Sequence, residues 1–144
     1  MKRFDIYLIG GMTKFGKDDF TKSDIWRVYL KTSLENCNSS YKIHVINPND
    51  YYNFLDDSNY DSEREVMEFD LHKVRHSDLC ICNFNDPSSL GSMAELAIAY
   101  DRRIPVIGLC ENDEKLHPWQ EEMITKKFTN IEELSLYVAK YYLN

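Results

Sequence analysis

Residues 77–100 constrain the fold most, because they predict a buried strand, a polar loop and an apolar helix in direct succession. Leu79 to Phe84 is a short apolar run that is typical of a buried strand. A cluster of turn formers from Asn85 to Ser89 ends this strand. Helical spacing then returns, with apolar side chains at Met93, Leu96, Ala97 and Tyr100. Open α/β folds place ligand sites just beyond the carboxyl ends of such strands.

Strands and helices alternate along the whole chain. The sequence predicts strands over 4–9, 43–46, 79–84, 104–109 and 123–128. Helices are expected over 25–34, 62–76, 93–100 and 131–142, with Asn130 as the N-cap of the last one. The spacing places Ile25, Val28, Tyr29 and Thr32 on one side of the helix over 25–34. The alternation predicts a single α/β domain over 1–144, a flavodoxin-like doubly wound five-stranded parallel sheet with helices on both faces.

Composition and charge narrow the classes of partner. The 144 residues carry a formal net charge of −7, which argues against a nucleic-acid polymer because such a partner favours a basic stripe. No apolar run approaches the roughly 20 residues that a membrane span needs, so no membrane partner is expected. The apolar run near the N-terminus is too short for a signal peptide. We therefore expect a cytoplasmic protein.

The cysteines and histidines do not predict a metal site. Cys80 and Cys82 lie two residues apart on one strand, and Cys37 and Cys110 add no spacing typical of ligands. Reduced thiols packed as small hydrophobic side chains are the favoured interpretation. His72 and His76 have an i, i+4 spacing that can bind a metal, but the residues around them are charged.

Two acids stand where apolar residues are expected. Glu95 is the one acid of an otherwise apolar helix, and Asp70 falls in the middle of the stripe formed by Val66 and Val74. A buried carboxylate needs compensation or its pKa shifts, and such acids cluster at functional sites. The alternatives are an Asp70 that caps a loop or meets an arginine, and a Glu95 that faces solvent.

The loops at the switch point supply the rest of a predicted site. The first and third strands end at Gly10-Gly11-Met12-Thr13 and at Asn83 to Gly91, so both loops lie where a ligand is expected. Serines at a helix N-terminus can hold sugar or phosphate oxygens, although Ser88 or Ser89 can serve only as a cap. The predicted substrate-binding residues are Gly10, Gly11, Met12, Asn83, Asp86, Ser89, Gly91 and Ser92. Two carboxylates beside such loops suggest glycosyl chemistry, in which one acid attacks the anomeric carbon and another group handles the proton.

The sequence resembles the nucleoside 2-deoxyribosyltransferase family, which includes the 2'-deoxynucleoside 5'-monophosphate N-hydrolases. The resemblance runs from Tyr7 to about Tyr100. Its motifs are Tyr7-Leu8-Ile9-Gly10-Gly11-Met12, Asp70-Leu71 followed by Ser77-Asp78, and Leu90-Gly91-Ser92-Met93-Ala94-Glu95-Leu96-Ala97. It implies a flavodoxin-like fold, and Glu95 as the nucleophile that forms a deoxyribosyl ester. It also implies that Asp70 contacts the base or its proton, that Tyr7 orients Glu95, and that the active protein is a homodimer or larger homo-oligomer.

Two departures from the family pattern bear on the reaction. The transferases have an aspartate six residues before the glutamate, where this chain has Ser89. The monophosphate hydrolases have a serine there that touches the 5'-phosphate, so Ser89 and Ser92 favour a nucleotide substrate. Those hydrolases also have a serine in the first glycine loop, where this chain has Gly11, with Thr13 or Lys14 as replacements. Transfer and hydrolysis therefore both stay open.

The prediction is an enzyme that cleaves the N-glycosidic bond of a 2'-deoxynucleoside or its 5'-monophosphate, with transfer to a second base or to water. A carboxylate nucleophile forms such an intermediate unaided, so no cofactor is predicted. The alternatives are a non-catalytic module that binds or senses nucleotides in the same crevice, and a hydrolase of NAD-type nucleotides.

Two aromatic segments leave alternatives open. Tyr51, Tyr52 and Phe54 can stack on a base or belong to the core or an interface. The segment 116–119 can reach a neighbouring active site or form a surface turn with Trp119 packed on the last helix.

Overall fold

The centre of the molecule is a twisted parallel sheet. The computed structural model describes residues 1–12, 20–52 and 60–144, without the side chains of residues 20–22. Within these residues five parallel strands pair in the order β2-β1-β3-β4-β5. They are β1 (Arg3–Gly10), β2 (Lys42–Ile46), β3 (Leu79–Asn83), β4 (Val106–Leu109) and β5 (Lys126–Phe128). The predicted flavodoxin-like topology is confirmed, with the switch point between β1 and β3.

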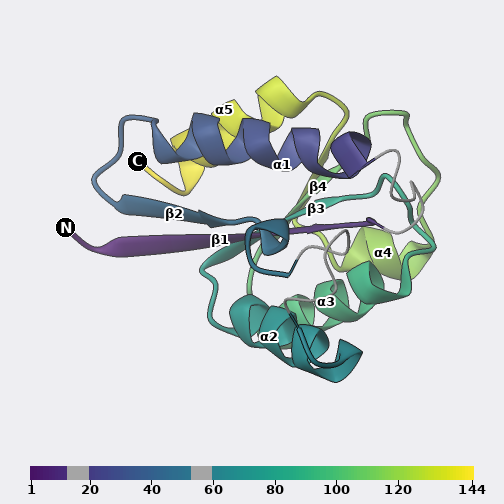
Figure 1. The fold of residues 1–144 in the computed structure, drawn as a ribbon. Helices are drawn as coiled ribbons and strands as arrows, with labels where there is room; N and C mark the ends of the chain where they lie inside the picture. The colour runs from purple at the N-terminus through teal and green to yellow at the C-terminus, as the bar shows by residue number, and fades with distance from the viewer. Residues whose placement is uncertain (13–19, 53–59) are drawn as a thin grey trace.

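Helices cover both faces of the sheet. α1 (Phe20–Glu35) and α5 (Ile131–Tyr141) lie on one face, while α2 (Glu63–Arg75), α3 (Leu90–Asp101) and the short α4 (Pro118–Glu122) lie on the other (Figure 1). A 3₁₀ turn, η2 (Pro48–Asp50), follows β2. Each layer has its own hydrophobic core because the strands, buried on both faces, send alternate side chains to opposite sides. Leu30 and Leu134 belong to one core, and Val74 and Leu96 to the other.

Polar caps fix where three of the helices begin. The side chains of Ser62, Ser89 and Asn130 accept hydrogen bonds from backbone N–H groups in the first turns of α2, α3 and α5. These bonds satisfy donors that a helix start otherwise leaves free. The predicted N-cap at Asn130 is confirmed, and Ser89 rather than Ser88 caps α3.

Helix α1 buries a different side from the one that the sequence spacing singled out. Ile25, Val28 and Tyr29 are exposed, whereas Trp26 and Arg27 are buried, together with Leu30 and Leu34 further along the helix. Apolar residues lie all around this helix, so its pattern defines a face only weakly. The packing of Trp26 and the two leucines against the sheet and α5 decided which side points inward.

The segment 116–119 begins a short helix that the sequence pattern did not predict. His117 caps α4 and accepts a hydrogen bond from the Trp119 N–H, while the His117 backbone N–H donates to the Gln120 side-chain oxygen. Trp119 is 72% exposed and lies beside Tyr100 of α3, not on the last helix. The interpretation of Trp119 as packed on α5 is therefore wrong, and a role in a neighbouring active site stays a prediction.

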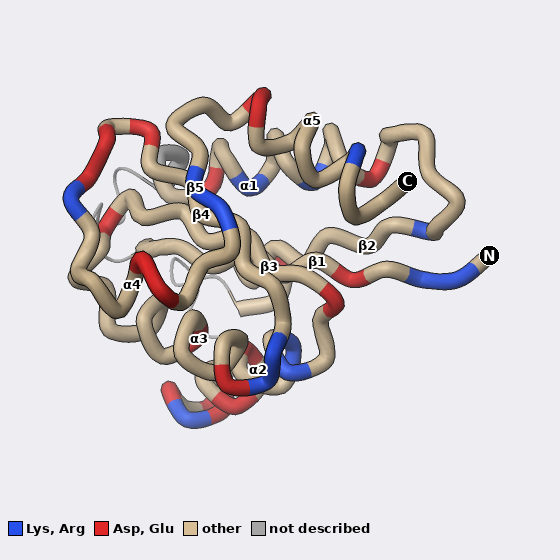
Figure 2. The backbone as a smooth tube through the Cα atoms, turned by 180° about the vertical axis from the view of Figure 1, so that it is seen from behind, with Lys and Arg blue, Asp and Glu red and all other residues tan. Residues whose placement is uncertain are grey.

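Charged residues are spread over the helices and loops of both layers, without a basic stripe in the part of the chain that is described (Figure 2). None of the described helices is long and apolar enough to cross a membrane.

Candidate active site

The carboxyl ends of β1 and β3 bring the two predicted loops together. Gly10 pairs in register with Asn83, the last residue of β3. The next residue, Gly11, donates its N–H to the Asn85 side chain at 3.1 Å. A Cβ atom at Gly11 would lie 2.9 Å from the Cβ of Asp86. Gly11 therefore allows a close approach of the two loops that a larger residue would prevent.

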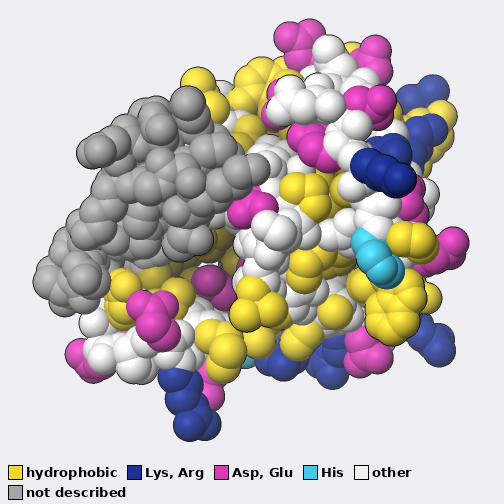
Figure 3. Space-filling model, turned by 90° about the vertical axis from the view of Figure 1, so that its right-hand side faces the viewer, with side chains coloured by type: hydrophobic (Ala, Val, Ile, Leu, Met, Phe, Trp, Pro, Cys, Tyr) yellow, Lys and Arg dark blue, Asp and Glu magenta, His cyan; other side chains and the backbone are white. Residues whose placement is uncertain are grey.

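Two adjoining cavities open where these loops meet α2 and α3. A polar cavity of about 200 Å³ is lined by Gly10, Met12, Asp70, Ser89, Gly91, Ser92 and Glu95. An apolar cavity of about 450 Å³ between α2 and α3 is lined by Glu63, Val66, Met67, Asp70, Leu71, Leu90, Gly91, Ala94 and Glu95. Asp70 and Glu95 border both, so the two carboxyls stand at the junction. Figure 3 shows a hollow with acidic atoms inside it and hydrophobic side chains at its border.

Glu95 projects from the second turn of α3 towards the sheet. Its Oε2 atom is shielded from solvent and has no hydrogen-bond partner among the described residues. Burial raises the pKa of this carboxyl to about 8, with Tyr7 lowering it, Asp70 raising it and Arg27 lowering it. The alternative of a solvent-facing glutamate is therefore wrong.

Asp70 approaches the same junction from α2. Its Oδ1 atom is buried and has no hydrogen-bond partner among the described residues, and none of the ion pairs among these residues includes Asp70. Burial raises the pKa of Asp70 to about 7, against a lowering effect of the Arg27 charge. The charge of Asp70 raises the pKa of Glu95, so the protonation states of the two carboxyls are linked.

Tyr7 lies beneath the carboxyls, fully buried in β1. Burial raises its pKa well above the ordinary value, and the charges of Glu95 and Asp70 add to this effect. The phenol therefore keeps its proton and can donate it to Glu95, which is the direction in which it lowers the pKa of Glu95. The contact is looser than a standard hydrogen bond, since the Tyr7 hydroxyl has no partner within standard geometry among the described residues.

The serines of the α3 N-terminus have different surroundings. The Ser92 hydroxyl is buried and has no partner among the described residues, whereas the Ser89 hydroxyl caps the helix at 3.4 Å from the Ser92 N–H. Ser88 donates its hydroxyl to Asp86 at 2.7 Å. Ser89 and Ser92 line the polar cavity, and Asp86 does not.

Unpartnered oxygens mark this junction as a place for a ligand. Four buried side-chain oxygens, of Tyr7, Asp70, Ser92 and Glu95, have no hydrogen-bond partner among the described residues. Buried polar atoms are nearly always paired in a folded protein, so a cluster of unpaired ones needs an explanation. A polar ligand in the cavity would supply the missing partners.

The predicted residues divide into three groups. Gly10, Met12, Asp70, Ser89, Gly91, Ser92 and Glu95 line the polar cavity. Tyr7 lies below it, and Gly11, Asn83 and Asp86 support its loops. Thr13 and Lys14 lie outside the described residues. The sequence patterns did not identify Arg27, which is fully buried and acts on both acids.

The aromatic residues after β2 pack on α2. The rings of Tyr51 and Tyr52 lie 5.0 and 5.1 Å from Phe69, and the Tyr52 hydroxyl donates to Glu65 at 3.2 Å. These contacts favour a packing role over base stacking. Phe54 lies outside the described residues.

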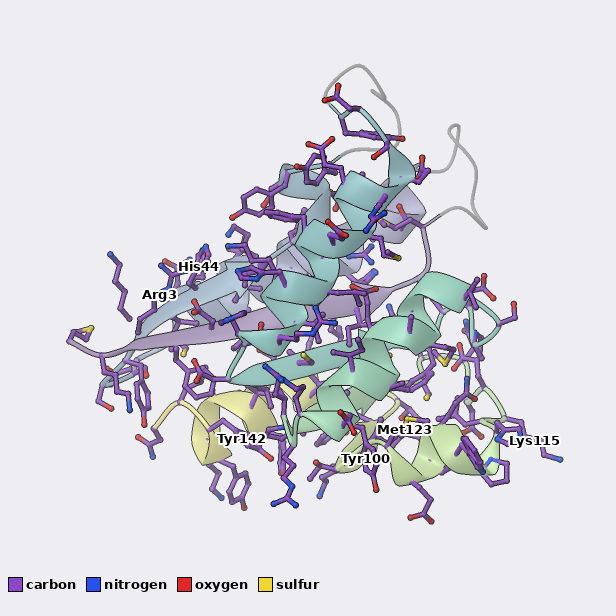
Figure 4. The ribbon with its side chains drawn as sticks, turned by 90° about the horizontal axis from the view of Figure 1, so that it is seen from below. Arg3, His44, Tyr100, Lys115, Met123 and Tyr142 are labelled. Carbon is purple, nitrogen blue, oxygen red and sulfur yellow. The ribbon has the colours of Figure 1, made fainter. Side chains whose placement is uncertain are left out.

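A cavity larger than either of these two lies elsewhere. It measures about 560 Å³ and lies at the amino ends of β4 and β5, where Tyr100 and Met123 are neighbours (Figure 4). Its charged lining residues, Asp101, Arg103 and Glu122, are exposed, and none of its lining side chains has a buried oxygen without a partner among the described residues. Size alone therefore does not make it the better candidate, and the pair of cavities beside Asp70 and Glu95 stays the candidate site.

No group of three or more metal-ligating side chains occurs among the described residues. The rings of His72 and His76 lie 4.2 Å apart on the exposed surface of α2. All four cysteines are free thiols, and Cys80, Cys82 and Cys110 are buried, as expected of small hydrophobic side chains.

Comparison with solved structures identifies the fold. No model of a known protein family matches the chain, and no curated protein matches it significantly. A 2-desoxiribosyltransferase from Leishmania mexicana superposes with a TM-score of 0.71 at 13% identity, covering 97% of this chain and 99% of that one. A 2-deoxyribosyltransferase from Bacillus psychrosaccharolyticus gives a TM-score of 0.65 at 14% identity, covering 91% and 90%.

The chain shares the fold of these 2-deoxyribosyltransferases. A conserved protein from Enterococcus faecalis V583 is also similar, with a TM-score of 0.75 at 18% identity over 96% of this chain and 98% of that one. At these identities the likeness to 2-deoxyribosyltransferases is a likeness of fold, and the chemistry has to be argued from the residues of this chain.

Proposed function

We propose that this protein cleaves the N-glycosidic bond of a 2'-deoxynucleoside or its 5'-monophosphate. The observation that carries the proposal is the junction of the two cavities, where Glu95 and Asp70 stand together with unpartnered buried oxygens. Support comes from the fold shared with 2-deoxyribosyltransferases, and from a CMP N-glycosidase of Clostridium botulinum, with a TM-score of 0.59 at 14% identity over 93% of this chain and 97% of that one.

Glu95 is the proposed nucleophile. Its carboxylate attacks C1' while the C1'–N bond breaks, and the bonding electrons leave with the base. The product is a glycosyl ester of Glu95, and the positive charge that develops on the sugar is stabilised by the same carboxylate. Tyr7, which keeps its proton, holds the carboxylate in the attacking position.

Asp70 is the proposed acid. It gives a proton to the departing base, which leaves as a neutral molecule. Water or a second base then attacks C1', the ester bond breaks, and the proton of the incoming nucleophile returns to Asp70. The pair therefore works with one proton between them, which must sit on Asp70 while Glu95 attacks. The pKa values near 7 and 8 place the pH range in which the pair holds a single proton close to neutrality.

The two adjoining cavities match the two halves of a nucleoside, with the sugar in the polar cavity and the base in the apolar one. The polar cavity, with Ser89 and Ser92 at the N-terminus of α3, offers hydroxyls and a helix dipole to the sugar and to a 5'-phosphate. No bound cofactor is needed for the proposed reaction, since the carboxylate itself forms the intermediate.

The test is base release, measured by chromatography with deoxynucleosides, deoxynucleotides, their ribo forms and NAD, each with and without a second free base. A new nucleoside or nucleotide would show transfer, and free base with free sugar or sugar phosphate would show hydrolysis. Glu95→Ala is expected to abolish turnover, while Glu122→Ala, outside the site, keeps it. Tight binding without base release from any compound would replace the proposal with a nucleotide-binding module.

A further inference from the structure

Arg27 is a fully buried cation on α1. Its Nη2 donates to the Gly10 carbonyl at 2.8 Å, and its Nη1 donates to the Ser23 carbonyl. The guanidinium lies 4.6 Å from the centre of the Trp26 ring. Among the described residues, its Nε has no hydrogen-bond partner and Arg27 belongs to no ion pair. A buried charge without an ion pair costs folding free energy, so its presence asks for a reason.

The guanidinium stands directly behind the wall of the polar cavity. Gly10 lines this cavity together with Glu95, and Arg27 binds the Gly10 carbonyl from the other side. A Cβ atom at Gly10 would lie 3.1 Å from Arg27 Nη2 and 2.6 Å from a ring carbon of Trp26. The buried cation therefore contacts the backbone of a residue that lines the same cavity as Glu95.

The surroundings of Arg27 leave Asp70 and Glu95 as the main acids on which its charge acts. Asp24, the acid next to it on α1, already accepts hydrogen bonds of 2.9 Å from the amide groups of Asn47 and Asn49. The other titratable groups that Arg27 influences face the cavity or the strands below it, namely Tyr7, Asp70, Cys82 and Glu95. Glu95 itself acts on Tyr7, Cys80 and Cys82, and Arg27 is the cation that lowers its pKa.

We propose that Arg27 is a positioning residue for the Glu95 nucleophile, whose buried charge favours the ionised form of that carboxylate while its hydrogen bond fixes the Gly10 wall. This inference rests on the proposed function of Glu95. Arginine suits the role because it keeps its proton even when buried, whereas a lysine in the same place can lose it. The low polarity around Glu95 strengthens the attraction between the two charges.

Titration of the substrate-free protein separates the charge from the hydrogen bond. Arg27→Gln can still donate to the Gly10 carbonyl but has no charge, and Arg27→Met has neither. We expect both to raise the midpoint of Glu95 by about one pH unit, followed by carbon-13 NMR of the carboxyl groups and assigned with Glu95→Gln. Arg27→Lys should give a smaller shift because it keeps a cation. Lys31→Met removes a cation one turn further along α1, where Lys31 donates to the Val45 carbonyl, and should leave the midpoint unchanged.

Kinetics then test the same idea in turnover. In Arg27→Gln the acid limb of kcat/KM should move to higher pH by the same amount as the Glu95 midpoint, and activity should recover as the pH rises. An unchanged midpoint in a folded Arg27→Gln or Arg27→Met protein would overturn the inference, even if activity fell. Arg27→Met guards against a variant that does not fold, since replacing a buried charge with an apolar side chain is often tolerated. Absence of base release by the wild type, with the NMR shift present, would remove the proposed function and not the electrostatic coupling.

Discussion

The two ends of the sheet hold their polar side chains in opposite ways. At the amino end of β1, Arg3 pairs with Asp5 at 2.6 Å and with His44 at 2.7 Å, and the Asp5 N–H donates to Asp78 at 2.8 Å. Figure 4 shows Arg3 and His44 side by side at this end. At the carboxyl end, one carboxyl oxygen of Asp70 and one of Glu95 are buried and have no hydrogen-bond partner among the described residues.

The difference in hydrogen bonding distinguishes polar groups that belong to the fold from polar groups that a ligand would contact. Exposed ion pairs such as Arg3–Asp5 satisfy themselves and contribute little to stability. Buried unpaired carboxyls cost free energy, and proteins keep such costs at functional sites. Buried oxygens without hydrogen-bond partners are therefore a better guide to the site here than cavity volume. Volume alone favours the cavity at the amino ends of β4 and β5.

Removing the acid at the carboxyl end should have the largest effect. Asp70→Asn cannot deliver a proton to the leaving base, so we expect kcat to fall by roughly 10²–10⁴-fold. Glu68→Gln, on the exposed side of the same helix, is the matched control and should keep full activity. A loss confined to KM would show that Asp70 only binds the base.

The pH dependence should expose the coupled pair. Below about pH 7 both carboxyls hold protons and Glu95 cannot attack, and above about pH 8 neither has one to give. We therefore expect a narrow bell in kcat/KM, with a loss of roughly 100-fold two pH units below the acid limb. A profile that stays flat from pH 5 to pH 9 would contradict the shared proton.

The same acids should make stability depend on pH in an unusual direction. Both carboxyls bind protons more tightly in the folded state than in the unfolded chain, because their folded pKa values are raised. The free energy of unfolding should therefore fall as the pH rises from about 4 to about 8. Glu95→Gln should be more stable than the wild type at pH 8 by about 1–3 kcal/mol, less than the full shift implies because part of the side chain is exposed. Urea unfolding at pH 5 and pH 8 checks this, and equal gains at both values would count against it.

The smallest effect is expected at the amino end. Arg3→Met breaks an exposed ion pair in which Arg3 is 56% exposed, so turnover should stay within about twofold of the wild type. The melting temperature and the pH profile should also be nearly unchanged. A large loss of activity would mean that the two ends of the sheet communicate, and the comparison between them would fail.

Much of the fold was predictable because it depends on local patterns. Apolar runs bounded by turn formers defined the strands, and alternation with helices fixed a parallel sheet and its switch point. Ser62 and Asn130 mark helix starts through contacts within four residues. The short helix α4 escaped prediction because five residues contain too little periodicity to recognise.

The candidate site was predictable only in part. Glu95 and Asp70 stood out because each is a charged residue in an apolar stripe, and such a stripe can be recognised from the sequence of a single helix. The buried face of α1 was not visible, because Ile25 and Val28 match a helical spacing as well as Trp26 does. The choice between them depended on contacts with a sheet that is distant in sequence.

By itself, the sequence determined the order of strands and helices and the meeting of two loops at the carboxyl ends of neighbouring strands. It also determined that two acids stand at positions where apolar residues are expected. Only the tertiary structure decided that those acids border the same cavities, that each has a buried oxygen without a partner among the described residues, and that Arg27 binds the Gly10 carbonyl. Hydrophobic periodicity indicates which side of a helix or strand faces a core. It cannot report which charges face each other across that core, because such distances arise only when separate segments pack together.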